Sequence, residues 1–128
     1  MKTTSYEISK QLKKNGLSEK LGFMEYYYNT DKQLKRRYEE PYCSTWKENT
    51  QVDCFSYDLE TILEALPNFI ANKNKGENCL VIDVAFGEIH YEGDSDNETM
   101  FITTTEENES LADTAAKMWL KLKKEGLV

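Results

Sequence analysis

The sequence predicts an α+β domain in which helices pack on a mainly antiparallel sheet of about four to five strands. Three observations favour this class. Residues 79–86 are nearly all apolar and include several β-branched side chains, which is typical of a strand. Residues 88–92 alternate as a strand does, and residues 100–105 are rich in strand-forming side chains. Amphipathic stripes with helical spacing lie before and after these segments.

The first expected element is a short helix that begins at Thr4 and ends just before Gly16. Thr4 and Glu7 have the spacing of a capping box, in which each side chain accepts a hydrogen bond from the backbone amide of the other residue. Gly16 suits the left-handed conformation that often ends a helix. The apolar face is thin, essentially Ile8 and Leu12, so we expect this helix on the surface.

Residues 22–28 and 34–40 predict a β-hairpin, because aromatic residues favour strands and the Asn- and Asp-containing segment between them favours a turn. Pro41 should end the second strand, since proline has no amide proton to donate to a sheet. Residues 41–56 are polar, and we expect them to be irregular.

Asp58 can cap a second helix, which Pro67 should end or kink. Its apolar stripe has the spacing i, i+3, i+4 and i+7 and consists of Leu59, Ile62, Leu63 and Leu66. We expect Phe69 and Ile70 to continue this apolar face in one tight turn. Residues 72–78 should form a solvated loop.

The central strand is expected at residues 79–86, covered on both faces. After the turn at residues 93–98 and the last strand comes a final helix, capped by Asn108 or Ser110 and stopped by Gly126. Its core stripe consists of Leu111, Ala115, Met118, Trp119 and Leu122. The expected order is α-β-β-α-β-β-β-α, in a single domain that spans residues 1–128.

Length and cysteine content limit the class of protein. A domain of 128 residues can bury enough surface to fold without a metal or a disulfide. The three cysteines Cys43, Cys54 and Cys79 are odd in number and lack C-x-x-C spacing, so we expect them to be reduced and to bind no zinc. No apolar run is long enough for a bilayer, and the first residues do not have the pattern of a signal peptide. We therefore expect a cytoplasmic protein.

The net charge of −7 is concentrated in the second half of the chain. Residues 1–64 carry a net charge of −1, and residues 65–128 carry −6. Between Asp83 and Asp113 the sequence has ten acidic residues and neither lysine nor arginine. Such a segment argues against direct binding of nucleic acid, because contacts to phosphate need cations.

The acidic segment is the candidate interaction surface. Its residues lie in the turn after the second-last strand and in the loop before the last helix: Asp94, Asp96, Glu98, Glu106, Glu107 and Glu109. If the last two strands are antiparallel, these two clusters need not coincide. Our hypothesis is a non-enzymatic binding module whose acidic face meets a basic protein partner. The alternative interpretation is that the charge only keeps the protein soluble.

Other chemistry finds weaker support in the sequence. The turn at Asp94 resembles the opening of a calcium loop, but Thr99 and Thr105 occupy the positions of the required glycine and bidentate glutamate. His90 is the single histidine and has no partner motif, so we predict no catalytic residue, no metal and no cofactor. A minor structural or assembly component and a small-ligand or cation binder remain alternatives. A homo-oligomer is also compatible with the sequence.

The layout of the chain as a whole resembles a group of known proteins. It combines the opening segment Ile8–Leu17, the tyrosine-rich hairpin, the helix Leu59–Leu66 with the strand pair after it, and the closing helix that runs to Gly126. Together these are similar to small proteins carried by phages and prophages of anaerobic gut bacteria, from which residues 41–56 depart. The resemblance implies an accessory protein of a mobile element, carries over no site residues, and favours interaction over catalysis.

Overall fold

The computed structural model describes residues 3–17, 25–28, 33–36, 52–72, 76–93 and 99–128. Within these residues the chain has an α+β fold with three helices and seven strands. In chain order the elements are α1 (Tyr6–Lys14), β1 (Glu25–Tyr28), β2 (Gln33–Arg36), β3 (Val52–Ser56), α3 (Leu59–Ala65), β4 (Phe69–Asn72), β5 (Gly76–Asp83), β6 (Glu88–Glu92), β7 (Thr99–Thr104) and α4 (Leu111–Lys124). The predicted fold class is confirmed. The single domain over residues 1–128 stays a prediction.

The strands form two antiparallel sheets, and two of the strands were not predicted. The three-stranded sheet has the order β2-β1-β3, and the four-stranded sheet has the order β4-β5-β6-β7. The hairpin of β1 and β2 is confirmed. The prediction that residues 41–56 are irregular is wrong for β3, which pairs with β1. The prediction that Phe69 and Ile70 continue a helical face is also wrong, because they begin β4, which pairs with β5.

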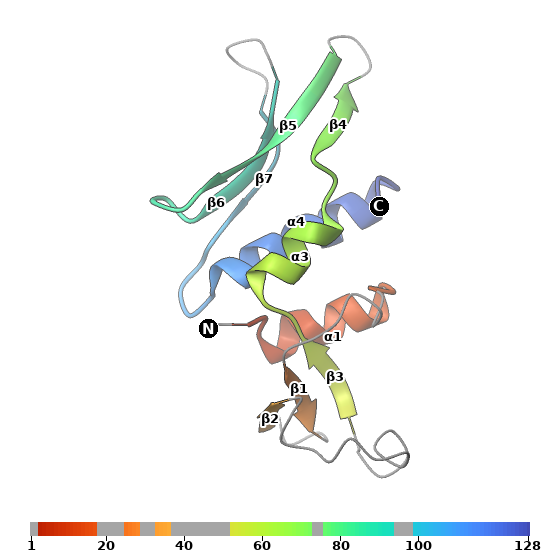
Figure 1. Cartoon of the computed structure of the whole chain (residues 1–128), viewed down its shortest axis with the longest axis vertical. Coiled ribbons are helices and arrows are strands. Elements are labelled where there is room, and N and C mark those ends of the chain that lie inside the picture. The colour runs from red at the N-terminus through yellow and green to blue at the C-terminus, as the bar shows by residue number, and fades with distance from the viewer. Residues whose placement is uncertain (1–2, 18–24, 29–32, 37–51, 73–75, 94–98) are drawn as a thin grey trace.

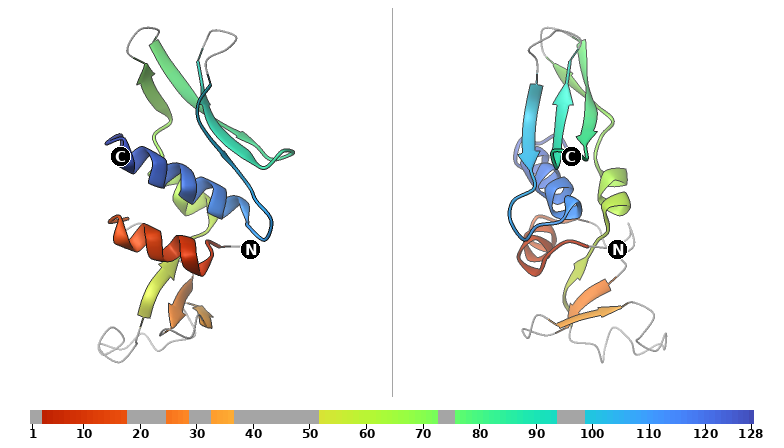
Figure 2. Two further views of the ribbon diagram at one scale, coloured as in Figure 1. Left: turned by 180° about the vertical axis from the view of Figure 1, so that it is seen from behind. Right: turned by 90° about the vertical axis from the view of Figure 1, so that its left-hand side faces the viewer.

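The helices lie between the two sheets (Figures 1 and 2). α4 contacts β6 and β7 of the four-stranded sheet, α1 contacts β3 of the three-stranded sheet, and α4 also contacts α1 and α3. Figure 1 shows all three helices on the same side of the four-stranded sheet. Among the described elements no helix covers the opposite side of that sheet, which we call the outer face.

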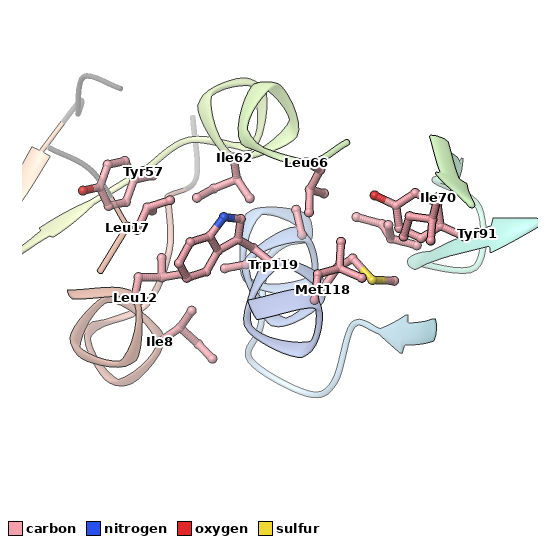
Figure 3. Close-up of a cluster of buried hydrophobic side chains, with 14 residues drawn as sticks. Ile8, Leu12, Leu17, Tyr57, Ile62, Leu66, Ile70, Tyr91, Met118 and Trp119 are labelled. Carbon is pink, nitrogen blue, oxygen red and sulfur yellow. The ribbon is translucent and has the colours of Figure 1, made fainter. Parts of the chain in front are cut away.

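The core forms around α4, as Figure 3 shows. The indole ring of Trp119 points from α4 toward Leu12 and Leu17, and Met118 lies on the side of α4 that faces the strands. The fully buried side chains of the core include Leu12, Ile62, Ile89, Tyr91, Met118 and Leu122. The buried positions of α4 therefore extend beyond one stripe, because α4 packs against helices on one side and a sheet on the other.

The ends of the helices follow the expected chemistry with one correction. Ser5, and not Thr4, caps α1, and its hydroxyl accepts from the Ile8 amide at 3.4 Å. The Thr4 hydroxyl instead accepts from the Tyr57 amide at 3.0 Å, which explains why it is not free to cap the helix. Asp58 caps α3 as predicted. Of the two candidates for α4, Ser110 is the cap.

The expectation of a central strand covered on both faces is wrong. β5 runs from Gly76 to Asp83, so Val84 and Phe86 lie in the turn after it, and both are exposed. Cys79 within β5 is exposed as well. The apolar run thus lies half in a strand with one open face and half in a surface turn.

Candidate functional site

The outer face of the four-stranded sheet is defined by the alternation of its strands. Ile89 and Tyr91 in β6 are fully buried against the helices, so the residues that alternate with them point outward. Thr103 in β7 faces the helices as well, since its hydroxyl donates to the Thr114 carbonyl of α4 at 3.1 Å. The register between the strands then places the following residues on the outer face: Phe69, Ala71, Glu77, Cys79, Val81, Asp83, Glu88, His90, Glu92, Thr99, Ile102 and Thr104.

This face is acidic and partly apolar. Four of these outer-face residues are Asp or Glu, and none is Lys or Arg. Asp83 lies directly opposite Glu88 in the register, a like-charge pair that destabilises a sheet. Between the acids the face exposes apolar side chains, with Phe69 59% and Ile102 45% exposed. A surface of this composition attracts cations and offers apolar area for contact.

His90 lies at the centre of the outer face, between two carboxylates of its own strand. Its Nδ1 is 2.9 Å from Glu88 Oε2, and its Nε2 is 3.9 Å from Glu92 Oε2. Nδ1 is buried and has no hydrogen-bond partner among the described residues, so its short contact with Glu88 is not a hydrogen bond. Val81 is the register partner of His90 on the neighbouring strand. The imidazole is thus flanked by the carboxylates of Glu88 and Glu92.

The turn between β5 and β6 carries the most exposed apolar side chains of the described chain. Val84 is 74% exposed and Phe86 is 82% exposed. Figure 1 shows this turn projecting from the four-stranded sheet at the left of the view. The Asp83 carboxylate accepts from the Phe86 amide at 3.2 Å, which helps to fix the turn. We call Val84, Ala85 and Phe86 the hairpin tip.

The hairpin tip lies beside the loop that carries three of the predicted acidic residues. Thr105 donates from its amide to the Gly87 carbonyl at 2.7 Å and from its hydroxyl to the same oxygen at 3.0 Å. The chain continues from Thr105 directly into Glu106 and Glu107, both of which are exposed. The tip is therefore bordered by acids from two segments, Asp83 and Glu88 on its own hairpin and Glu106 with Glu107 on the loop.

Three of the six predicted acidic residues lie within the described part of the chain. Asp94, Asp96 and Glu98 lie outside the described residues, in the connection between β6 and β7. Glu106, Glu107 and Glu109 follow β7, in the loop that leads to α4.

Glu109 has a structural role within its own loop. Its Oε1 accepts from the Glu106 amide at 2.9 Å and from Lys117 Nζ at 2.6 Å. Burial acts to raise the pKa of Glu109, but the hydrogen bonds from Lys117 and from the Glu106 amide outweigh it and hold the pKa below its usual value. A carboxylate engaged in this way is less available to a partner than Glu106 or Glu107.

Sequence reasoning missed the hairpin tip and the acids of the sheet. Val84 and Phe86 were placed in a buried strand, because an apolar run resembles a core segment when the covering layer is unknown. Glu88 and Glu92 were recognised as part of an alternating strand but not as a surface. The alternation itself was the available signal, since it separates Ile89 and Tyr91 from Glu88, His90 and Glu92.

Two other features, a metal site and a membrane-spanning helix, have no candidate among the described residues. No cluster of three or more His, Cys, Asp and Glu side chains is placed there to hold a metal ion. No helix among them combines the length and the apolar character needed to cross a membrane.

Comparison of the chain with protein-family models, with curated proteins and with solved structures finds no match. The phage or prophage origin expected from the layout therefore stays a prediction.

Proposed function

We propose that this protein is a non-enzymatic binding module that inserts its hairpin tip into a basic surface of a protein partner. The observation that carries the proposal is the exposure of Val84 and Phe86 on a projecting turn whose neighbours are acidic. Exposed apolar side chains cost solubility, so a projecting pair of them is typical of a contact site. An aromatic residue at the centre of an interface often supplies much of the binding free energy.

The acids around the tip select the partner. Asp83, Glu88, Glu106 and Glu107 would meet Lys or Arg side chains at the rim of the partner's pocket, which raises the association rate and excludes acidic competitors. The same charges disfavour nucleic acid, whose phosphates they repel. They also disfavour anionic membranes, which attract basic and not acidic segments. A basic protein is thus the class of partner that fits both the apolar tip and its rim.

The test begins with a photo-crosslinking phenylalanine analogue at Phe86. A protein crosslinked at this position is identified, purified and titrated against the wild type and a Val84→Ser/Phe86→Ser variant by calorimetry. Because loss of a central aromatic anchor costs about 2 kcal/mol or more, we expect the double variant to bind at least roughly 30-fold more weakly. Affinity of the wild type should also fall as salt rises.

Matched controls separate the tip from general surface effects. Leu127→Ser removes an exposed apolar side chain near the C-terminus and should leave the affinity unchanged. Glu88→Gln/Glu106→Gln should slow association, whereas Glu60→Gln/Glu125→Gln removes the same charge from exposed positions on other elements and should not. Equal binding by the wild type and the Val84→Ser/Phe86→Ser variant would refute the proposal and favour solubility as the reason for the charge.

The two other candidate functions have their own readouts. Co-sedimentation of the protein with assembled particles would support a minor structural or assembly component. A rise in melting temperature on addition of calcium, abolished by Asp94→Asn/Asp96→Asn, would support a cation binder.

A further inference from the structure

The two edges of the four-stranded sheet differ in how their backbone is occupied. β4 and β7 are the edge strands, so each has one row of amides and carbonyls that no neighbouring strand of the sheet can pair. At β7 two carbonyls of this row accept hydrogen bonds from lysine side chains of α4. Lys121 Nζ donates to the Ile102 carbonyl at 2.7 Å, and Lys117 Nζ donates to the Thr104 carbonyl at 2.6 Å.

The unpaired backbone amides and carbonyls of β4 are those of Phe69 and Ala71. The Asn68 carbonyl accepts from the Leu80 amide at 2.9 Å, which shows that residue 68 forms its hydrogen bonds toward β5. Hydrogen-bonding direction alternates along an antiparallel strand, so Ile70 and Asn72 also bond toward β5, opposite Asn78 and Gly76. The amides and carbonyls of the intervening residues therefore point away from the sheet. Within the described part of the chain, no group bonds to them.

β4 also lacks two of the features that usually protect an edge strand from pairing. Its residues Phe-Ile-Ala-Asn contain neither a charge nor a proline. The Phe69 side chain is 59% exposed, and Ala71 is exposed beside it. An uncharged edge with exposed apolar side chains is a template for an added strand.

The pattern of β4 is complementary to itself. In an antiparallel pair of two β4 strands related by a two-fold axis at Ile70, Phe69 of each copy lies opposite Ala71 of the other. Both residues have outward backbone groups, so each such pair exchanges two hydrogen bonds. Their side chains share the outer face at a Cβ separation of about 5 Å, where the large Phe69 ring covers the small Ala71 methyl group.

We propose that a second copy of this chain pairs with β4, which joins the two four-stranded sheets into one continuous antiparallel sheet. Electrostatics favours this arrangement over a face-to-face dimer. Edge pairing leaves the acidic outer faces side by side, whereas face-to-face docking would press Asp83, Glu88 and Glu92 against the same acids of the copy. It also leaves the hairpin tip free for a different partner.

Sedimentation velocity at several protein concentrations tests the proposal with two variants of β4. Ala71→Pro removes an outward amide without breaking the ladder to β5, because a proline is tolerated where the amide faces away from the sheet. Phe69→Lys places a charge at the edge. We expect the wild type to sediment as a dimer that dissociates on dilution, and both variants as monomers. Phe86→Lys, the same change at an exposed phenylalanine outside the edge, should leave the dimer intact.

Amide hydrogen exchange distinguishes loss of the dimer from loss of the strand. In the wild type at high concentration the amides of residues 69 and 71 should exchange slowly, and in Phe69→Lys they should exchange fast, while Ile70 and Asn72 stay protected in both. A wild type that is monomeric at every concentration would overturn the proposal. A dimer that survives both β4 variants would also overturn it. The same holds if the amide of residue 71 is protected only after an unrelated extended peptide is added, since β4 would then bind a different partner.

Discussion

Asp113 in α4 accepts a hydrogen bond from the backbone amide of Ser5, with 2.7 Å between the Ser5 nitrogen and Oδ1, across 108 positions of sequence. Its other carboxylate oxygen accepts from the Ser110 amide at 3.1 Å. Ser5 and Ser110 are the N-caps of α1 and α4, so one buried carboxylate serves the starts of two helices. The negative charge also lies where the dipoles of both helices favour it.

We predict that Asp113→Asn lowers the free energy of unfolding by about 2 kcal/mol, because a carboxamide has one acceptor oxygen and would present an amino group to the second backbone amide. Chemical denaturation at neutral pH measures the change. Glu125→Gln, at an exposed position at the C-terminal end of α4, should change the stability by no more than about 0.5 kcal/mol. Equal effects of the two substitutions would contradict the assigned role of Asp113.

Gly87 is predicted to tolerate a side chain poorly for two separable reasons. Its φ of +61° is unfavourable for other residues, and a Cβ there would lie 2.9 Å from the Thr105 hydroxyl and 3.0 Å from the Thr105 Cβ. Gly76→Ala is the matched control, since Gly76 has a φ of +92° and open space around its Cβ position. We expect Gly87→Ala to lower the melting temperature more than Gly76→Ala does. A smaller effect at Gly87 would show that the contact with Thr105 is not tight.

Residues that are close together in the sequence predicted most of the helices and the later strands. They did not predict the strands β3 and β4. The cap of α3 at Asp58 and the bounds of β6 follow from residues adjacent in sequence. β3 was missed because its strand character depends on pairing with β1, more than 20 positions away. β4 was missed because Phe69 and Ile70 continue a helical spacing that Pro67 had already ended.

Of the candidate site, the sequence predicted the negative charge but not the arrangement of its residues. The sequence shows that residues 83–113 are acidic, but the grouping of those acids depends on which ones a strand turns outward and which ones bond internally. Glu109 is held by Lys117, eight positions away, and Phe86 is exposed because β5 ends at Asp83 and leaves the rest of the apolar run in a surface turn. Both outcomes depend on packing between layers, which periodicity along the chain does not specify.

Glu109 is expected to stabilise the fold at neutral pH and to lose this effect in acid. Because its pKa is lower in the folded than in the unfolded protein, the stabilisation is present above the ordinary glutamate pKa and disappears as the pH falls through the folded value. Glu109→Gln should therefore cost about 1 kcal/mol at neutral pH and nothing at low pH. Glu107→Gln, which removes the same charge from an exposed position of this loop, controls for net charge. Denaturation curves for both variants across the acid range test this prediction. A loss of stability in Glu109→Gln that persists in acid would refute the role of ionised Glu109.

Tyr91 should make the fold sensitive to alkaline pH. The side chain is fully buried, and its hydroxyl donates to the Pro67 carbonyl at 2.7 Å. Burial raises the pKa of Tyr91 to about 12 from 10.0. The folded state thus holds this proton more tightly than the unfolded state, so stability is complete below pH 10 and is lost as the pH rises through about 12.

Tyr91→Phe isolates this contribution. At neutral pH the variant should lose about 1 kcal/mol, because the Pro67 carbonyl loses its donor. Between pH 10 and 12 its stability should fall less steeply than that of the wild type, since one buried phenol no longer ionises on unfolding. Thermal denaturation at a series of alkaline pH values compares the slopes, and the absorbance of tyrosinate reports ionisation directly. Parallel slopes for the two proteins would show that Tyr91 ionises equally well in the folded and unfolded chain, and its burial against Pro67 would then not be what limits alkaline stability.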